Sequence, residues 1–468
     1  MSDLSWSLII VDVHSKSINR EIIIVSINKQ IPTVPLNKFI KHSLEILKNP
    51  LPFHNRNFEE LGDIFRLKIG LSTSVVFCRN AAFAVYVLQK NQKNYKKSKI
   101  QTEDLVKYVG EGLLTSEGEK WKKQRKMMQP AFHKIQLQNL LSGMQDTIVS
   151  EFKNIETNKV IDVFPILNDL AFQTVVKSLF TKAAKAKDME RLQFITEANQ
   201  RMLVKELRQP YLGWWFKISG TLDKYLELSK EARTILKGIV DQRKTSGKRY
   251  DDLLDMLLES KYDDGKGMTE EQLIDEILII FTAGHETTSN ALTFTFQLLA
   301  KHPEWQEKIH DEWRTLGGDD TDVMTRVSTS KICQQVLEES MRLYPPAYFI
   351  DRVNIEADSF NGIAFEPGCN LLFSVYEIHR HPKLWKQPNV FMPERFAEGS
   401  RPFSSQYFPF GAGPRKCIGN NFAMFEMIIA VTELVSKFKI QADFESIDIT
   451  PLITLKPKNA FLSFEKRA

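Results

Sequence analysis

One cysteine in this chain stands in a setting that suits a metal ligand. Cys417 follows a turn that contains Gly411 and Gly413, has Arg415 and Lys416 just before it, and precedes an apolar stretch that predicts a helix. Nearby cations and the positive end of a helix favour the thiolate form of a thiol, and glycines let the backbone press against a flat, bulky group. A soft thiolate in such a loop suits iron. On the loop alone, an inert or mildly reactive cysteine in a surface turn is an equally good interpretation.

A second group of polar residues lies in the middle of a long helix that we expect over residues 269–302. The group is Ala283, Gly284, His285, Glu286, Thr287 and Thr288. It does not stabilise a buried helix, because Gly alone costs about 1 kcal/mol against Ala and an unpaired buried carboxylate costs more. Small side chains at Ala283 and Gly284 would let a flat ligand lie against the helix. Thr287 would interrupt the local hydrogen-bond ladder and offer its hydroxyl to a bound oxygen species, while Glu286 would connect to water. The alternative is a kink with solvated polar residues.

Two further pairs have spacings that place their side chains together on one helix face. Glu339 and Arg342 are three residues apart and would usually form an ordinary surface ion pair. Arg395 could complete a three-member network with them behind the cysteine loop. Trp121 and Arg125 are four residues apart, and an aromatic N–H beside a guanidinium suits carboxylate recognition.

A stripe of lysines lies on the other side of the Trp121 helix. Lys122, Lys123 and Lys126 form this stripe, and Lys416 extends it. Such a cationic face could receive an acidic protein partner. A solvated helix face is at least as good an interpretation.

A mostly helical body must hold these residues in place. Alternating apolar and charged residues over 65–77 predict a β-hairpin. Two capping boxes predict helices that begin at Ser116 and Thr269. Further helices are expected over Lys331 to Leu343 and over about 418 to 438, with short strands and turns between them and a strand-rich end. The predicted fold class is therefore mostly α with a smaller β part.

Length and composition set the limits of the domain organisation. The 468 residues contain no linker, repeat or low-complexity run, so we expect one domain over 1–468. Its expected parts are a β-containing segment over 1–95, a helical body over 96–345 and a mixed segment over 346–468. We also expect a monomer.

The charge balance and the cysteines limit the partners and the compartment. The net charge of +5 indicates no nucleic-acid partner. Four widely spaced cysteines suggest neither a disulfide framework nor a zinc site and fit a reducing cytosol. The richest apolar patch of the first forty residues, Ile22–Val25, is too short for a transmembrane anchor. A cytoplasmic location follows, with peripheral membrane contact through an apolar patch left open.

Taken together, the chain resembles the cytochrome P-450 superfamily of haem-thiolate monooxygenases. Five motifs in the family's order carry this resemblance, which covers nearly everything beyond about residue 60. They are Trp121-x-x-x-Arg125, Ala283-Gly284-x-Glu286-Thr287-Thr288, Glu339-x-x-Arg342, Pro393-Glu394-Arg395-Phe396 and Phe410-x-x-Gly413-x-Arg415-x-Cys417-x-Gly419. The last motif is highly specific. The resemblance implies a triangular helical body around a buried haem b.

The resemblance also implies roles for single residues. Cys417 would be the axial ligand of the haem iron, and Phe410 would pack beside it and tune the iron. Trp121, Arg125, Arg415 and Arg352 would hold the haem propionates. The remaining residues of the expected cofactor site are Gly411, Gly413, Ile418, Ala283 and Gly284. Thr287 and Glu286 would organise proton delivery, whereas Glu339, Arg342 and Arg395 would be structural.

The implied reaction inserts one atom of O2 into a C–H bond of a lipophilic small molecule and reduces the other to water. No flavin, nicotinamide or iron–sulfur fingerprint occurs, so the electrons would come from a ferredoxin or flavodoxin with its reductase. The pattern looks closest to soluble, bacterial-type fatty-acid hydroxylases, with a terpenoid as another candidate substrate. A haem-thiolate peroxygenase or isomerase is an alternative function, and a non-catalytic haem sensor is a weaker one. Segments 202–216 and 347–350, the stretch before Ser116 and Phe281 would line the substrate pocket, with 210–216 as a lid or a packed helix end.

Overall fold

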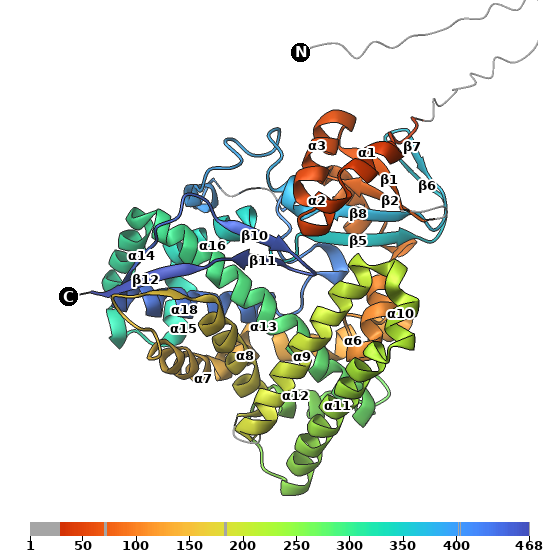
Figure 1. Cartoon of the computed structure of the whole chain (residues 1–468). Helices are drawn as coiled ribbons and strands as arrows, with labels where there is room; N and C mark the ends of the chain where they lie inside the picture. The colour runs from red at the N-terminus through yellow and green to blue at the C-terminus, as the bar shows by residue number, and fades with distance from the viewer. Residues whose placement is uncertain (1–28, 70–72, 182–184, 401, 403, 468) are drawn as a thin grey trace, which may run out of the picture.

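A computed structural model describes residues 29–467 except 70–72, 182–184, 401 and 403. Helices form most of the body, which has a roughly triangular outline, and the strands gather along its upper part (Figure 1). The α-helices are α1 Leu36–Lys41, α2 Ser43–Lys48, α3 Leu51–Leu61, α4 Ala81–Val85, α5 Val106–Val109, α6 Gly118–Met128, α7 Lys134–Phe152, α8 Phe164–Phe180, α9 Ala186–Arg208, α10 Gly213–Ile218, α11 Thr221–Ser246, α12 Leu253–Glu259, α13 Glu270–Lys301, α14 Pro303–Thr315, α15 Val323–Thr329, α16 Lys331–Leu343, α17 Val375–Ile378 and α18 Asn420–Lys437.

The sheets join segments that are far apart in the sequence. The strands are β1 Ile64–Ile69, β2 Thr73–Cys78, β3 Tyr95–Lys96, β4 Val160–Asp162, β5 Phe349–Asn354, β6 Asp358–Phe360, β7 Ile363–Phe365, β8 Asn370–Ser374, β9 Phe438–Gln441, β10 Asp448–Pro451, β11 Leu455–Lys458 and β12 Phe461–Lys466. The largest sheet has the order β1-β2-β8-β5-β3, in which β2 and β8 are parallel. It therefore combines strands from the beginning and the end of the chain. A second sheet, β4-β12-β9, ties the last strand to the helical body.

The expected hairpin is present as β1 and β2, which pair antiparallel with Phe65 opposite Phe77. The two rings stack with centroids 5.2 Å apart in an apolar cluster under α3. Lys331–Leu343 forms α16 as expected. The last helix, α18, begins at Asn420, two residues later than the sequence predicts.

One of the two expected capping boxes is wrong. Thr269 Oγ1 accepts a hydrogen bond from the Gln272 N–H and caps α13 as predicted. The residue before α6 is instead Glu117, and no side chain caps that helix. Ser116 donates its hydroxyl to Gln124 Oε1 at 2.7 Å, so it is spent on packing rather than on the helix terminus.

The helix α13 crosses the interior of the molecule. Its first half and its last half are buried, and α8, α16 and α18 pack against it. Val175 of α8 lies against Gly284, where an added Cβ would come 3.2 Å from Val175 Cγ2. The glycine thus lets α8 approach α13 closely. This contact accounts for Gly284 by helix packing, and not by the flat ligand that the sequence suggested.

In the part of the chain that the structure describes, no helix has both the length and the apolar character needed to cross a membrane. The apolar segment Ile22–Val25 lies outside the described residues.

Candidate functional site

The loop before α18 holds Cys417 in a tight turn. Gly411 and Gly413 have φ of 71° and 68°, which non-glycine residues rarely adopt. A side chain at Gly413 would collide with the backbone carbonyl of Leu88, whereas Gly411 borders open space. The Cys417 N–H then donates to the Phe410 carbonyl at 2.9 Å and closes the turn. The glycine spacing therefore serves the loop's own geometry, as predicted for a sharp turn.

The Cys417 thiol borders an internal opening. Its side chain is exposed, yet desolvation by the surrounding protein raises the pKa of the thiol above its usual value. The Gly419 backbone N–H and the charges of Arg125 and Lys416 lower this pKa by less. The expectation that the loop alone favours thiolate is thus wrong in its balance, because desolvation outweighs the cations. A bound metal ion would reverse that balance, since a coordinating thiol is deprotonated by the ion's own charge.

The middle of α13 is open on one side. Ala283 is exposed although the helix around it is buried, and Thr287 is half-buried. Thr287 Oγ1 donates to the Ala283 carbonyl at 2.8 Å. The helix is continuous from Glu270 to Lys301, so the predicted interruption at Thr287 is absent. The hydroxyl bonds back to its own helix instead of breaking it.

Glu286 is held from the C-terminal strands. Its Oε1 accepts a hydrogen bond from Thr454 Oγ1 at 3.0 Å, and Asn290 Nδ2 donates to the same Thr454 oxygen at 3.0 Å. Glu286 is only partly buried, so its carboxylate needs no ion pair. The acid and the alcohol of the predicted pair are neighbours on α13, and Glu286 has a defined orientation.

Three cations meet beside the cysteine loop. Arg352 of β5 and Lys97 are 8% and 6% exposed, and Arg415 lies close enough to depress the pKa of both. Desolvation is the larger cause and lowers the pKa of Lys97 to about 7 and that of Arg352 to about 10. Glu117 accepts two hydrogen bonds from Arg415, while Arg415 Nε is buried without a partner in the described part of the chain. This cluster of Lys97, Arg352 and Arg415 is short of negative charge.

The sequence reasoning missed Lys97 and Glu117. Lys97 stands among other lysines in Lys96-Lys97-Ser98-Lys99, and nothing in that run distinguishes it. The fold buries it, and its ammonium donates to the carbonyls of Leu113 and Ser116 at 3.0 and 2.8 Å. Burial of a charge with two uncharged partners is a signal that only the tertiary structure provides.

Trp121 and Arg125 of α6 meet the cysteine loop from the other side. The Arg415 guanidinium lies over the Trp121 ring, 4.5 Å from its centroid. Arg125 Nη1 donates to the Lys416 carbonyl at 2.8 Å. Both residues therefore converge on the loop as predicted. Arg125 stands nearer to the thiol than to the cluster of Lys97, Arg352 and Arg415, since the Cys417 charge acts on its pKa.

The remaining predicted loop residues have apolar contacts. Phe410 and Ile418 are half-buried and pack on the main core. Ile418 also borders a surface depression of about 400 Å³ next to Arg125 and Lys134. Phe281, predicted to line a substrate pocket, is fully buried and stacks on Phe172. That prediction is wrong, because this face of α13 is filled by α8.

The predicted network behind the loop is confirmed. Arg342 donates from Nε and Nη2 to both Glu339 oxygens at 2.7 and 2.8 Å, and the two side chains have no exposed surface. Arg395 Nε lies 3.3 Å from Glu339 Oε1. Arg342 also donates to three backbone carbonyls between residues 379 and 390. The network therefore anchors the irregular chain that leads to the cysteine loop.

These features fit the predicted haem. A thiol borders an internal opening, and small side chains on α13 border another. The cluster of Lys97, Arg352 and Arg415, with an unpartnered guanidinium nitrogen, suits the carboxylates of a propionate edge. A group that is flat, apolar and anionic at one edge would satisfy all three.

Comparison with known proteins points the same way. A family model described as cytochrome P450 matches residues 32–464. The 11-oxo-beta-amyrin 30-oxidase of Glycyrrhiza uralensis is 32% identical over 380 residues, 76% of this chain and 72% of that protein. The echinocystic acid 23-monooxygenase of Saponaria officinalis is 29% identical over 462 residues, 89% of this chain and 87% of its own. The cytokinin hydroxylase of Arabidopsis thaliana is 32% identical over 385 residues, 80% of this chain and 75% of its own.

Solved structures share the fold. The crystal structure of the cytochrome P450DA heme domain has a TM-score of 0.81 at 21% identity and covers 94% of this chain and 99% of its own. The retinoic-acid-bound cyanobacterial CYP120A1 has a TM-score of 0.79 at 22% identity, covering 91% and 96%.

Proposed function

The chain belongs to the cytochrome P450 family, and from that membership we propose that it hydroxylates a lipophilic, terpenoid-like small molecule with electrons from a separate redox protein. As a member of this family it is a haem-thiolate monooxygenase with haem b as cofactor. The chemistry that haem supplies when bound is activation of O2, with thiolate donation favouring O–O cleavage. The observation that carries the proposal is the Cys417 thiol at an internal opening beside the cluster of Lys97, Arg352 and Arg415.

Each conserved role is proposed for a residue with a matching environment. Cys417 ligates the iron, and the Gly419 N–H that contacts its sulfur stabilises negative charge there. Arg415, Arg352 and Lys97 bind the propionates, which relieves the repulsion among these three cations.

Proton delivery is assigned to Thr287 and Glu286. The Thr287 hydroxyl stands at the open side of α13, and its hydrogen bond to Ala283 leaves its lone pairs toward the opening. Glu286 is partly exposed and fixed by Thr454, so its carboxylate can exchange protons with water. The two residues together would move a proton from solvent to an oxygen bound at the open side of α13.

The terpenoid-like substrate is supported by the names of the relatives, which include oxidases of beta-amyrin and echinocystic acid derivatives. The fatty-acid alternative and the bacterial-type assignment stay predictions. The peroxygenase and isomerase alternatives need no external electrons and tend to lack the acid–alcohol pair, which this chain keeps at Glu286 and Thr287.

The electron donor is proposed to dock on the face near Cys417. Lys122 and Lys126 of this face already pair with Glu119 and Asp263, at 2.5 and 2.7 Å. Lys123 and Lys416 are exposed and are therefore the stronger candidates for contact with an acidic ferredoxin or flavodoxin.

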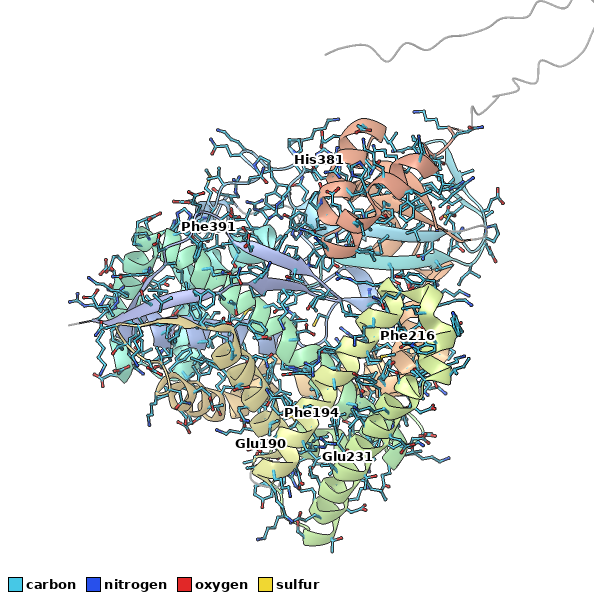
Figure 2. The ribbon with its side chains drawn as sticks, viewed as in Figure 1. Glu190, Phe194, Phe216, Glu231, His381 and Phe391 are labelled. Carbon is cyan, nitrogen blue, oxygen red and sulfur yellow. The ribbon has the colours of Figure 1, made fainter. Side chains whose placement is uncertain are left out.

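A cytoplasmic location with peripheral membrane contact is also proposed. Large apolar side chains are exposed in two adjacent segments, α1–α2 and the stretch from residue 211 to the end of α10. They are Leu36, Ile40, Leu44, Tyr211, Trp214, Trp215 and Ile218, each at least half exposed. Arg208 donates to the Leu47 carbonyl at 3.3 Å and joins the two segments. Phe216 is buried next to them (Figure 2), so segment 211–218 is anchored by one ring and exposes the others. Tryptophan and tyrosine favour membrane interfaces.

A spectral and turnover experiment tests the proposed function. Reduced holoenzyme with carbon monoxide should give the red-shifted Soret band of thiolate ligation, and Cys417→Ala should lose it. Cys369→Ala, a partly buried cysteine away from the loop, is the control and should keep the band. Hydroxylated terpenoid should form with reductase, donor protein and NADPH. Turnover with peroxide alone would favour the peroxygenase instead.

A further inference from the structure

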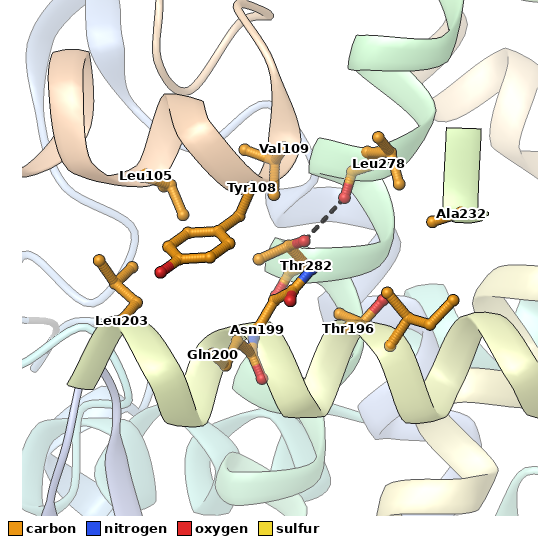
Figure 3. Close-up of a pocket in the computed structure, with 11 residues that line it drawn as sticks. Leu105, Tyr108, Val109, Thr196, Asn199, Gln200, Leu203, Ala232, Leu278 and Thr282 are labelled. Atoms are coloured by element: carbon orange, nitrogen blue, oxygen red, sulfur yellow. Dashed lines mark hydrogen bonds between the residues drawn. The ribbon is translucent and has the colours of Figure 1, made fainter. Parts of the chain in front are cut away.

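A small cavity lies between α9, α11, α13 and the segment that ends with α5 (Figure 3). Its volume of about 20 Å³ admits one group of the size of a water molecule. Leu105, Val109, Leu203 and Leu278 give it apolar walls. Thr282 also borders it and directly precedes Ala283, the exposed residue of the open side of α13.

Asn199 presents an unpartnered acceptor in this cavity. Its side chain is 7% exposed, and Oδ1 has no hydrogen-bond partner among the described residues. Asn199 Nδ2 donates to Ser229 Oγ at 2.9 Å, and Ser229 in turn donates to the Tyr225 carbonyl at 3.3 Å. Because the Ser229 hydrogen is spent on a carbonyl, Ser229 can only accept from the amide. This chain fixes the amide orientation and leaves the oxygen of Asn199 as its unpaired end.

The other polar groups around the cavity have used their hydrogens. Thr196 and Thr282 donate to the carbonyls of Leu192 and Leu278, each at 2.8 Å. Both hydroxyls therefore offer only lone pairs to the cavity. Tyr108 donates to Glu206 Oε2 at 2.5 Å, so its hydrogen is not offered either. The cavity thus has an excess of acceptors and calls for a ligand that brings a hydrogen.

We propose that Asn199 Oδ1 accepts a hydrogen bond from a hydroxyl group of a polycyclic terpenoid alcohol, and that this contact orients the substrate over the open side of α13. A hydroxyl fits the volume and supplies the missing hydrogen. A carboxylate at this point would face only lone pairs and be repelled, so the cavity selects against the head group of a fatty acid. This inference rests on the proposed function and narrows its substrate class.

The experiment compares three probes that differ at one position. β-Amyrin, its 3-O-methyl ether and its 3-deoxy hydrocarbon are titrated into the holoenzyme, and the dissociation constant is read from the haem spectral shift. Wild type should bind the alcohol about 5- to 100-fold more tightly than the ether or the hydrocarbon, as expected for pairing a buried acceptor. Asn199→Leu should abolish that ratio. Asn199→Ala serves if the leucine variant fails to load haem.

A matched control is Gln193→Leu on the same helix, where the amide donates to Asp169 in an exposed position. It should keep the wild-type ratio. Equal binding of the three probes by wild type would mean that water alone occupies the cavity and would overturn the proposal, as would an unchanged ratio in Asn199→Leu or no spectral shift with any probe. Product from the hydrocarbon with donor and reductase, without preference for the alcohol, would leave the proposed function intact and remove only this inference.

Discussion

The Glu117 carboxylate accepts two hydrogen bonds from the Arg415 guanidinium, with N···O distances of 2.9 and 2.5 Å, although the residues are 298 positions apart. This pair ties the start of α6 to the cysteine loop. It is also the ion pair that neutralises part of the cluster formed by Lys97, Arg352 and Arg415. Lys97 and Arg352 keep depressed pKa values nonetheless, because desolvation acts on both.

The depressed pKa of Lys97 predicts how stability depends on pH. Its folded pKa of about 7 lies below the ordinary 10.5, so the unfolded chain binds more protons between these values. Without haem, the free energy of unfolding should therefore rise from pH 7 to 9, by up to about 1.4 kcal/mol per pH unit from this group. Lys97→Met should remove this rise, and bound haem should reduce it by restoring the charged form. Urea unfolding before and after haem extraction measures both, and equal slopes for wild type and Lys97→Met would contradict the assignment.

Removing one partner of the buried network should be costly. Glu339→Gln leaves the Arg342 charge with no exposed surface and no counter-charge, so the free energy of unfolding should fall by about 3–5 kcal/mol. Glu227→Gln, which breaks an exposed pair with Lys230, is the control and should have little effect. Urea denaturation of the two variants compares them, and similar losses would show that burial of the network matters less than we infer.

Loss of the Thr287 hydroxyl should separate electron use from product. Thr287→Ala should keep haem and the thiolate spectrum but form several-fold less product per NADPH, because the oxygen nearest α13 loses its proton donor. Thr293→Ala removes a hydroxyl with the same back-bond, to the Ser289 carbonyl at 2.7 Å, in a buried part of α13. That control should stay coupled. Product, NADPH consumption and peroxide are measured together, and normal coupling in Thr287→Ala would exclude the role.

Charge reversal should identify the docking face. Lys123→Glu should slow the first electron transfer at low salt, and the difference from wild type should shrink as salt rises. Lys248→Glu makes the same change at an exposed site beyond α11 and should have no effect. Stopped-flow reduction with a ferredoxin or flavodoxin gives the rate. An unchanged rate in Lys123→Glu would place the donor elsewhere.

Exposed tryptophans predict membrane contact. The double change Trp214→Ser and Trp215→Ser should lower cosedimentation with vesicles of phosphatidylcholine and phosphatidylglycerol, since their exposed rings would be the inserted groups. Phe194→Ser alters an exposed ring on α9 away from that surface (Figure 2) and should bind as wild type does. Absence of vesicle binding by wild type would refute the contact.

Local sequence signals determined much of the fold. The hairpin β1–β2, the Thr269 cap and the bounds of α16 follow from alternation, capping and helical periodicity, which act between near neighbours. The glycines of the cysteine loop belong to the same class, because a positive φ is a local demand. The family itself could be recognised from five short motifs.

Burial and distant pairing were decided by the tertiary structure. Glu117 looked like part of a capping box until the fold placed Arg415 beside it, and Lys97 could not be told from its neighbours before the chain buried it. Gly284 read as a ligand contact until α8 was seen to lie against it. The pKa of Cys417 shows the same limit: the sequence displayed the cations near the thiol, but only the packed structure sets the desolvation that outweighs them. Desolvation depends on every atom that surrounds a group, and those atoms come from all parts of the chain.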